Sequence, residues 1–287
     1  MLNLIRADLY RVTRLRGLRG QLPRYGLLHL AFALLLLAIM WAFGSAPYIE
    51  LNGALDTAGG VSLTAAVGGT FVSSKVLVLC CVFGSLGLAF EDMDHGFLKS
   101  VCGSLSGRLS YYVGRILFAG VWSLIMLALA TIVTLSLQLT GWLVFGGAPI
   151  APESIGTAIL WYLEVWFSCW TLASLLLLIG WVIREKQIAY LGAWLIPISA
   201  ISNLVQDIGT VLAAITDGPV NAIANTLVTV APWAPSHMLN QLQGGAAQLL
   251  DGGAGGLAVQ AGVVALAWFA GVCALTIIVT RRSDIAR

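Results

Sequence analysis

Long apolar blocks alternate with short polar segments along the whole chain. Each block is about as long as a helix must be to cross a hydrocarbon core of about 30 Å. The six blocks cover residues 27–46, 66–90, 113–145, 157–182, 188–205 and 257–280. The third is long enough to tilt or to project beyond the bilayer. The pattern therefore predicts an all-α membrane protein in which residues 27–287 form one domain of six transmembrane helices.

Residues 1–26 have a different pattern. Leu2, Ile5, Leu9 and Val12 recur at helical spacing, and six arginines accompany them: Arg6, Arg11, Arg14, Arg16, Arg19 and Arg24. This combination predicts an amphipathic elbow helix lying on the membrane surface. A cleaved signal peptide is the alternative, but the arginine-rich part is long and the block that follows has full spanning length.

The segment between the last two blocks, residues 206–256, is too long for a bare connection in a helix bundle. Its apolar pieces, 211–215 and 220–230, are interrupted by Asp-Gly-Pro, so neither spans. They predict short helices, re-entrant or extracellular, that dip into the outer leaflet. The prolines in 231–235 predict an extended break. The glycines in 244–256 predict a flexible outer loop.

Composition agrees with a membrane location. Hydrophobic residues make up 59% of the chain and charged residues only 10%, against roughly a quarter charged in an average soluble domain. The net charge of +2 gives no reason to expect a nucleic-acid partner. The five cysteines lack metal-binding spacing and are expected to be buried thiols: Cys80, Cys81, Cys102, Cys169 and Cys273.

The positions of the charges predict orientation. Of the fifteen Lys and Arg residues, fourteen lie in the N-terminal segment, in 91–115, at 184–186 or in 281–287. The loops 47–65, 146–156 and 206–256 contain acids and no Lys or Arg. The positive-inside rule then places both termini in the cytoplasm of a multi-pass protein of the cell membrane. Four tryptophans near span ends are expected to be interfacial anchors: Trp41, Trp142, Trp161 and Trp181.

Enzymatic motifs are absent from the sequence. No glycine-rich loop ends in GK[ST], and Gly68-Gly69-Thr70 with Lys75 has the wrong spacing for a phosphate site. There is no HExxH motif, and no span contains a Ser and a His that could pair. We expect no catalytic residue, cofactor or metal. A metal could in principle bind Glu91, Asp92, Asp94 and His95, but a solvated charged turn explains them.

Two charged residues lie inside apolar blocks. Lys75 lies nine residues after Ala66, and Glu164 lies seven residues after Thr157. Because both blocks start at the predicted outer face, the two side chains are expected at similar depth. Charges inside a membrane usually face a partner or a wet cavity, so the two residues are predicted to pair or to line an outward-opening translocation path. Alternatively, each snorkels separately towards the headgroups.

A set of motifs resembles one transporter family. After the second block the chain reads Phe90-Glu91-Asp92, then Gly96, Lys99, Arg108, Tyr111 and Arg115. With Leu4-Ile5-Arg6-Ala7-Asp8-Leu9-Tyr10 at the start and Pro232-Trp233 before the last block, this order resembles ABC type-2 transporter permeases over essentially the whole chain. Gly107 stands before Arg108 where that family often has Ser.

The resemblance implies a permease that dimerises with a second copy or a paralogous permease. It also implies two copies of a separate ABC ATPase subunit, which binds ATP and Mg. A cytoplasmic coupling helix between spans two and three transmits the ATPase movement. The residues placed there are Glu91, Asp92, Asp94, Lys99 and Arg108, assisted by the elbow arginines Arg6, Arg11, Arg14 and Arg16. Alternatively, these charges only fix the topology.

The cargo expectation follows from the spans, which contain few polar groups. An amphipathic or hydrophobic cargo is favoured, such as an antimicrobial peptide, a drug or a lipid. The layout of the chain resembles that of the shorter permeases found in antibiotic and bacteriocin export and immunity systems. The alternative function is a non-transporting membrane scaffold or sensor that holds partners with its elbow and loop. A membrane-embedded enzyme is disfavoured by the lack of a convergent catalytic set.

Overall fold

The architecture is almost entirely helical. The computed structural model describes residues 2–13, 20–43, 61–95, 105–145, 150–215, 225–226, 228–230, 233–251 and 256–282. Within them, the two-residue strands β1 (Val61–Ser62) and β2 (Ile150–Ala151) pair in parallel. The helical elements are α1 (Leu2–Thr13), α2 (Gln21–Phe43), α4 (Leu63–Val67), the π-helix η2 (Gly68–Val72), α5 (Val76–Asp94), α7 (Leu105–Phe145), α8 (Ile155–Ile183), α9 (Lys186–Leu195), α10 (Ala200–Ile215), α12 (His237–Gln241), α13 (Ala246–Asp251) and α14 (Gly256–Arg282).

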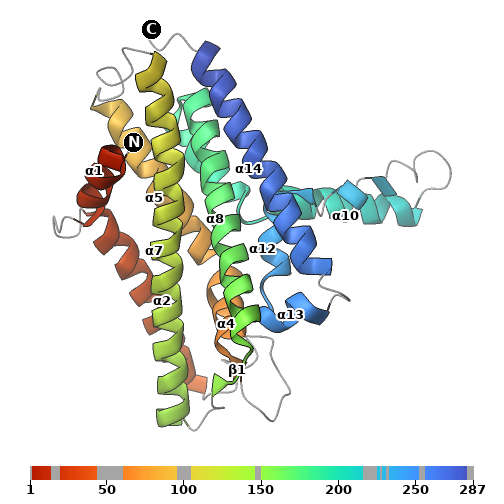
Figure 1. Cartoon of the computed structure of the whole chain (residues 1–287). Helices are drawn as coiled ribbons and strands as arrows, with labels where there is room; N and C mark the ends of the chain where they lie inside the picture. Colours follow the sequence, from red (N-terminus) through yellow and green to blue (C-terminus); the bar gives the residue numbers. More distant parts are fainter. Residues whose placement is uncertain are drawn as a thin grey trace.

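Five of the described helices are long and apolar enough to cross a membrane. Their apolar stretches are Gln21–Ile39, Val76–Asp94, Leu109–Val144, Ile155–Ile183 and Val259–Arg281. The chain is therefore a multi-pass membrane protein. In Figure 1 these helices run side by side, and α1 and the C-terminal end of α14 lie towards the same end of the bundle. We call this the α1 end and the opposite end, which carries α13, the cap end.

The predicted fifth span, 188–205, is not one helix. The chain leaves helical geometry after α9, and Ser199 takes a left-handed φ of 62° before α10 begins. Pro197 lies in this turn, and proline cannot continue a helix because it lacks a backbone N–H. Figure 1 shows α10 projecting sideways from the bundle. The block thus contains most of a ten-residue helix and the start of a sixteen-residue one, each too short to span.

The predicted second span, 66–90, is also interrupted. Short α4 and η2 precede a turn at 73–75, and Lys75 has a φ of 63° at the start of α5. Three successive hydroxyls here, on Thr70, Ser73 and Ser74, donate to carbonyls four residues earlier. Such bonds compete with the regular helical ladder and bend helices. Bonds of this kind also occur in the continuous helix α7, on Thr131, Thr134 and Ser136, so they accompany the interruption and do not by themselves explain it.

The predicted elbow segment, 1–26, includes the start of the next helix. The described part of α1 covers Leu2–Thr13, and α2 already begins at Gln21, so residues 21–26 belong to α2. Among the side chains described from residue 5 to residue 13, Asp8 and Val12, four residues apart, are the buried ones, whereas Leu9 is 37% exposed. The face that docks on the bundle therefore carries a charge.

Several tryptophans are buried and closely packed in the core. Trp122 is fully buried and donates to the carbonyl of Cys80 at 3.1 Å. A Cβ at Gly84 would lie only 2.2 Å from its Nε1 atom, so only glycine fits there. The predicted anchors Trp161 and Trp181 are buried, which makes that expectation wrong for both. Trp142 is exposed, and the side chain of Trp41 lies outside the described set.

Residues 237–251, which we call the cap, pack against the bundle through α12 and α13. Gly245 has a φ of +80° and its Cα lies against Ala65, where a Cβ would come within 2.4 Å of the backbone nitrogen. Thr64 Oγ1 accepts from the Ala246 amide at 2.9 Å and donates to Glu153 at 2.5 Å. The expectation of a flexible loop is wrong for the described part, 244–251.

Candidate functional site

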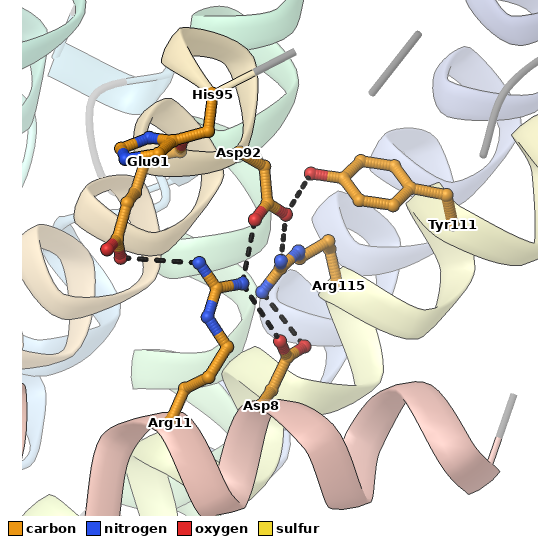
Figure 2. Close-up of polar contacts among 7 residues, drawn as sticks. All are labelled: Asp8, Arg11, Glu91, Asp92, His95, Tyr111 and Arg115. Atoms are coloured by element: carbon orange, nitrogen blue, oxygen red, sulfur yellow. Dashed lines mark hydrogen bonds and ion pairs between the residues drawn. The ribbon is translucent and has the colours of Figure 1, made fainter. Parts of the chain in front are cut away.

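A group of charged side chains joins three helices at the α1 end. Asp8 and Arg11 come from α1, Glu91 and Asp92 from the last turns of α5, and Tyr111 and Arg115 from the start of α7. Figure 2 shows them turned towards one another. We call these six residues the elbow cluster.

Asp92 is the centre of the elbow cluster. It is 1% exposed. One of its oxygens accepts from Arg11 Nη1 at 2.7 Å. The other accepts from the Tyr111 hydroxyl at 2.8 Å and from the Arg115 guanidinium. A buried carboxylate is tolerated when charged donors surround it in this way.

Arg115 connects both carboxylates. Its side chain is 2% exposed and forms a second ion pair, 2.8 Å long, with Asp8. The guanidinium carbon also lies 5.3 Å from the centre of the Tyr111 ring, a cation–π distance. Arg11 adds a weaker contact to Asp8 at 3.7 Å. Two buried carboxylates are thus balanced by the buried guanidinium of Arg115 and the partly exposed one of Arg11.

Asp8 is the carboxylate of the elbow cluster whose charge is least well compensated. Burial raises the pKa of its carboxyl above the usual value, although the neighbouring Arg115 opposes the shift. The charged form of Asp8 is therefore costly and depends on Arg115. The N-terminal helix can keep this charge buried only while α7 supplies its partner.

Exposed charges surround the buried set. Glu91 pairs with Arg11 at 3.4 Å and its side chain is 46% exposed. Asp94, at the end of α5, pairs with Lys186 at the start of α9, and both are about half exposed. Exposed pairs of this kind contribute little to stability, about 0–1 kcal/mol. Their carboxylates remain accessible to another protein.

The predicted coupling residues differ in how exposed they are. Glu91 and Asp94 are at the surface, but Asp92 is buried and cannot be touched by a partner. Lys99 lies outside the described residues, and of Arg108 only the backbone, in α7, is described. Among the elbow arginines, Arg11 enters the cluster and Arg6 is exposed, while Arg14 and Arg16 lie outside the described residues.

The predicted site did not include three members of the elbow cluster: Asp8, Tyr111 and Arg115. The two charged ones could have been recognised from the sequence. Asp8 is the only acid among six arginines in the first 26 residues. Arg115 stands at the very start of the third apolar block, at its edge, where a charge next to apolar residues is expected to have a partner.

Comparison with known proteins adds no assignment. The chain matches no protein-family model and no curated protein sequence. What the cluster does must therefore be inferred from its geometry. Among the described residues, no group of three or more His, Cys, Asp or Glu side chains is arranged to hold a metal ion. The contacts of the elbow cluster hold α1 against the end of α5 and the start of α7.

Lys75 and Glu164 do not form an ion pair. Lys75 is 8% exposed, and its ammonium group donates to Asn240 of the cap. Gln243 donates to the same amide oxygen at 3.1 Å. The buried Oε2 atom of Glu164 has no hydrogen-bond partner within the part of the chain that the structure describes. Lys75 therefore contacts the cap through Asn240, whereas the buried oxygen of Glu164 has no partner among the described residues.

Proposed function

We propose that the chain is the permease subunit of an ATP-driven ABC type-2 exporter that works with a separate ATPase subunit. The supporting observation is the elbow cluster. It joins the elbow helix, the end of α5 and the start of α7 through buried charges. The predicted coupling segment lies between the blocks 66–90 and 113–145, and the end of α5 and the start of α7 belong to it. Its middle part, residues 96–104, lies outside the described residues.

The cluster makes these elements move together. Buried ion pairs that lose one partner cost several kcal/mol, so the three helix ends resist separation. A force applied to the loop after α5 is then passed to α1 and to α7, and α7 has 41 residues, or about 60 Å at 1.5 Å per residue. Such a rigid helix can carry a displacement from the α1 end to the cap end.

The proposal places the α1 end in the cytoplasm, as the distribution of Lys and Arg predicts. The ATPase would contact the exposed carboxylates of Glu91 and Asp94. Asp92, Asp8 and Arg115 would act from inside, by fixing the position of those carboxylates. The cargo would be an amphipathic or hydrophobic molecule that leaves the membrane or the cell.

Co-purification with a candidate ABC ATPase tests this function. The measured quantities are co-elution in detergent and ATP hydrolysis, for wild type and for Glu91→Ala/Asp94→Ala. Two exposed ion pairs worth up to about 1 kcal/mol each, or about 2 kcal/mol together, predict up to about 30-fold weaker association. The matched control is Asp207→Ala, which removes an exposed acid from α10, on a different part of the chain.

Stable association that weakens only in the Glu91/Asp94 variant supports the permease. A folded chain that binds no ATPase contradicts it. Association without any change in ATP hydrolysis, and without cargo movement in vesicles, favours the scaffold instead.

A further inference from the structure

A groove runs between α8 and α14, which lie side by side in Figure 1 and pack against each other. Towards the cap end it opens into a cavity of about 230 Å³. The α8 wall contains Leu163, Glu164 and Phe167, and the α14 wall contains the small residues Ala261 and Ala265 together with Leu266. A second cavity of about 200 Å³ follows along the same two helices, lined mainly by apolar residues such as Leu175 and Leu275.

Glu164 is the charged residue of this groove. Its Oε2 atom is buried, and within the described chain it has neither a hydrogen-bond donor nor an ion-pair partner. Nine residues separate it from the start of α8, which places it about 14 Å along the helix axis. A carboxyl at that depth in an apolar wall is costly unless a partner joins it.

We propose that the groove binds a cationic amphiphile, with its ammonium head on the Glu164 carboxylate and its apolar tail along α8 and α14. Charge complementarity selects the head, because the other walls of the cavity are almost wholly apolar. The volume of about 230 Å³ is below the range of about 300–1,000 Å³ typical of pockets that enclose a whole ligand. The head and the first part of the tail are therefore enclosed, and the rest lies along the open groove.

The site would be a cargo site of the proposed permease and so rests on the proposed function, but binding itself needs no ATPase. Two other states of Glu164 are chemically reasonable. The carboxyl can stay protonated and empty, or it can bind the amine of a membrane phospholipid. The experiment separates both from the proposed occupant.

Equilibrium dialysis of the full-length chain in dodecyl maltoside, with dodecyltrimethylammonium as the probe, measures the binding. Glu164→Gln keeps the shape of the side chain and removes its charge. We expect binding about tenfold weaker, the effect of losing one charge-assisted contact. Asp207→Asn, which removes an exposed acid of α10, is expected to bind as wild type does. Dodecanol, which has the same tail without a charge, is expected to bind wild type and Glu164→Gln alike.

A second variant tests the groove separately from the charge. Ala265→Leu fills the α14 wall and leaves Glu164 in place, so it is expected to weaken binding of the probe as well. Each variant is compared by elution profile and melting temperature with wild type.

Equal affinity of wild type and Glu164→Gln overturns the proposal, because the carboxyl is then protonated or unused. Displacement of the probe by micromolar phosphatidylethanolamine also overturns it, in favour of a lipid occupant. Because no ATPase is present, failure of ATPase association leaves this result readable. Conversely, a chain that binds no amphiphile can still associate with an ATPase.

Discussion

Arg115 offers the sharpest test of the elbow cluster. The change Arg115→Met keeps much of the length and apolar stem of the side chain but removes the guanidinium that pairs with Asp8 at 2.8 Å and with Asp92. Arg11 remains, 2.7 Å from Asp92 and 3.7 Å from Asp8. Two buried carboxylates then share one cation. Breaking a buried ion pair in this way costs about 3–5 kcal/mol.

The second change is chosen to restore the balance. Asp8→Asn removes the carboxylate that depends most on Arg115, and Asp92 keeps Arg11 and the hydroxyl of Tyr111 as partners. We therefore expect the double variant Arg115→Met/Asp8→Asn to be more stable than Arg115→Met alone by about 2 kcal/mol. Asp8→Asn alone is expected to cost less than Arg115→Met.

Unfolding in mixed micelles of dodecyl maltoside and sodium dodecyl sulfate gives the four free energies of this cycle. The matched control is Arg24→Met, since Arg24 is exposed at the start of α2, and it should change stability by less than about 0.5 kcal/mol. If the double variant loses as much as the sum of the two single variants, the two charges do not stabilise each other and the account of the cluster is refuted.

Two further predictions concern pH and packing. Because the pKa of Asp8 is raised in the fold, the folded chain binds this proton more tightly than the unfolded chain does. The stability of wild type relative to Asp8→Asn should therefore rise as the pH falls from neutral towards 3.8, and a difference that falls or stays constant in this acid range would contradict the raised pKa. Gly84→Ala places a Cβ 2.2 Å from the Trp122 ring and should cost about 1–3 kcal/mol in the same unfolding assay. Adding Trp122→Phe, which removes the nearest atom, should recover part of that loss; no recovery would show that the contact is not the cause.

Apolar block length predicted most of the bundle. The helices α2, α5, α7, α8 and α14 overlap five of the six predicted spans, although their ends differ by up to about ten residues, because about twenty apolar residues in succession have few other stable states. The breaks were harder to predict. Hydropathy averaged over a block does not register a single Pro197, and it gives no sign of the left-handed turn at Lys75.

The site was predicted only in part, for a different physical reason. Charge pattern and motif order led to Arg11, Glu91 and Asp92, but not to their partners. Whether a carboxylate is exposed or buried depends on which helix covers it. Asp92 is covered by α1, and its α1 partner Arg11 lies 81 residues earlier in the sequence. No periodicity within one helix reports such a pairing. Lys75 shows the same limit, since its partner Asn240 lies 165 residues away.

The long separation between Asp8 and its main partner Arg115 has a consequence for biogenesis. Ribosomes add about 5–20 residues per second, so roughly 5–20 s pass between the synthesis of α1 and that of the start of α7. During this interval Asp8 has no α7 to neutralise it, and burying it would be unfavourable. The N-terminal helix must therefore wait at the water-facing surface and dock late, after two intervening helices have entered the membrane. Its docking thus follows the insertion of α7, and a chain that ends before α7 cannot take this step.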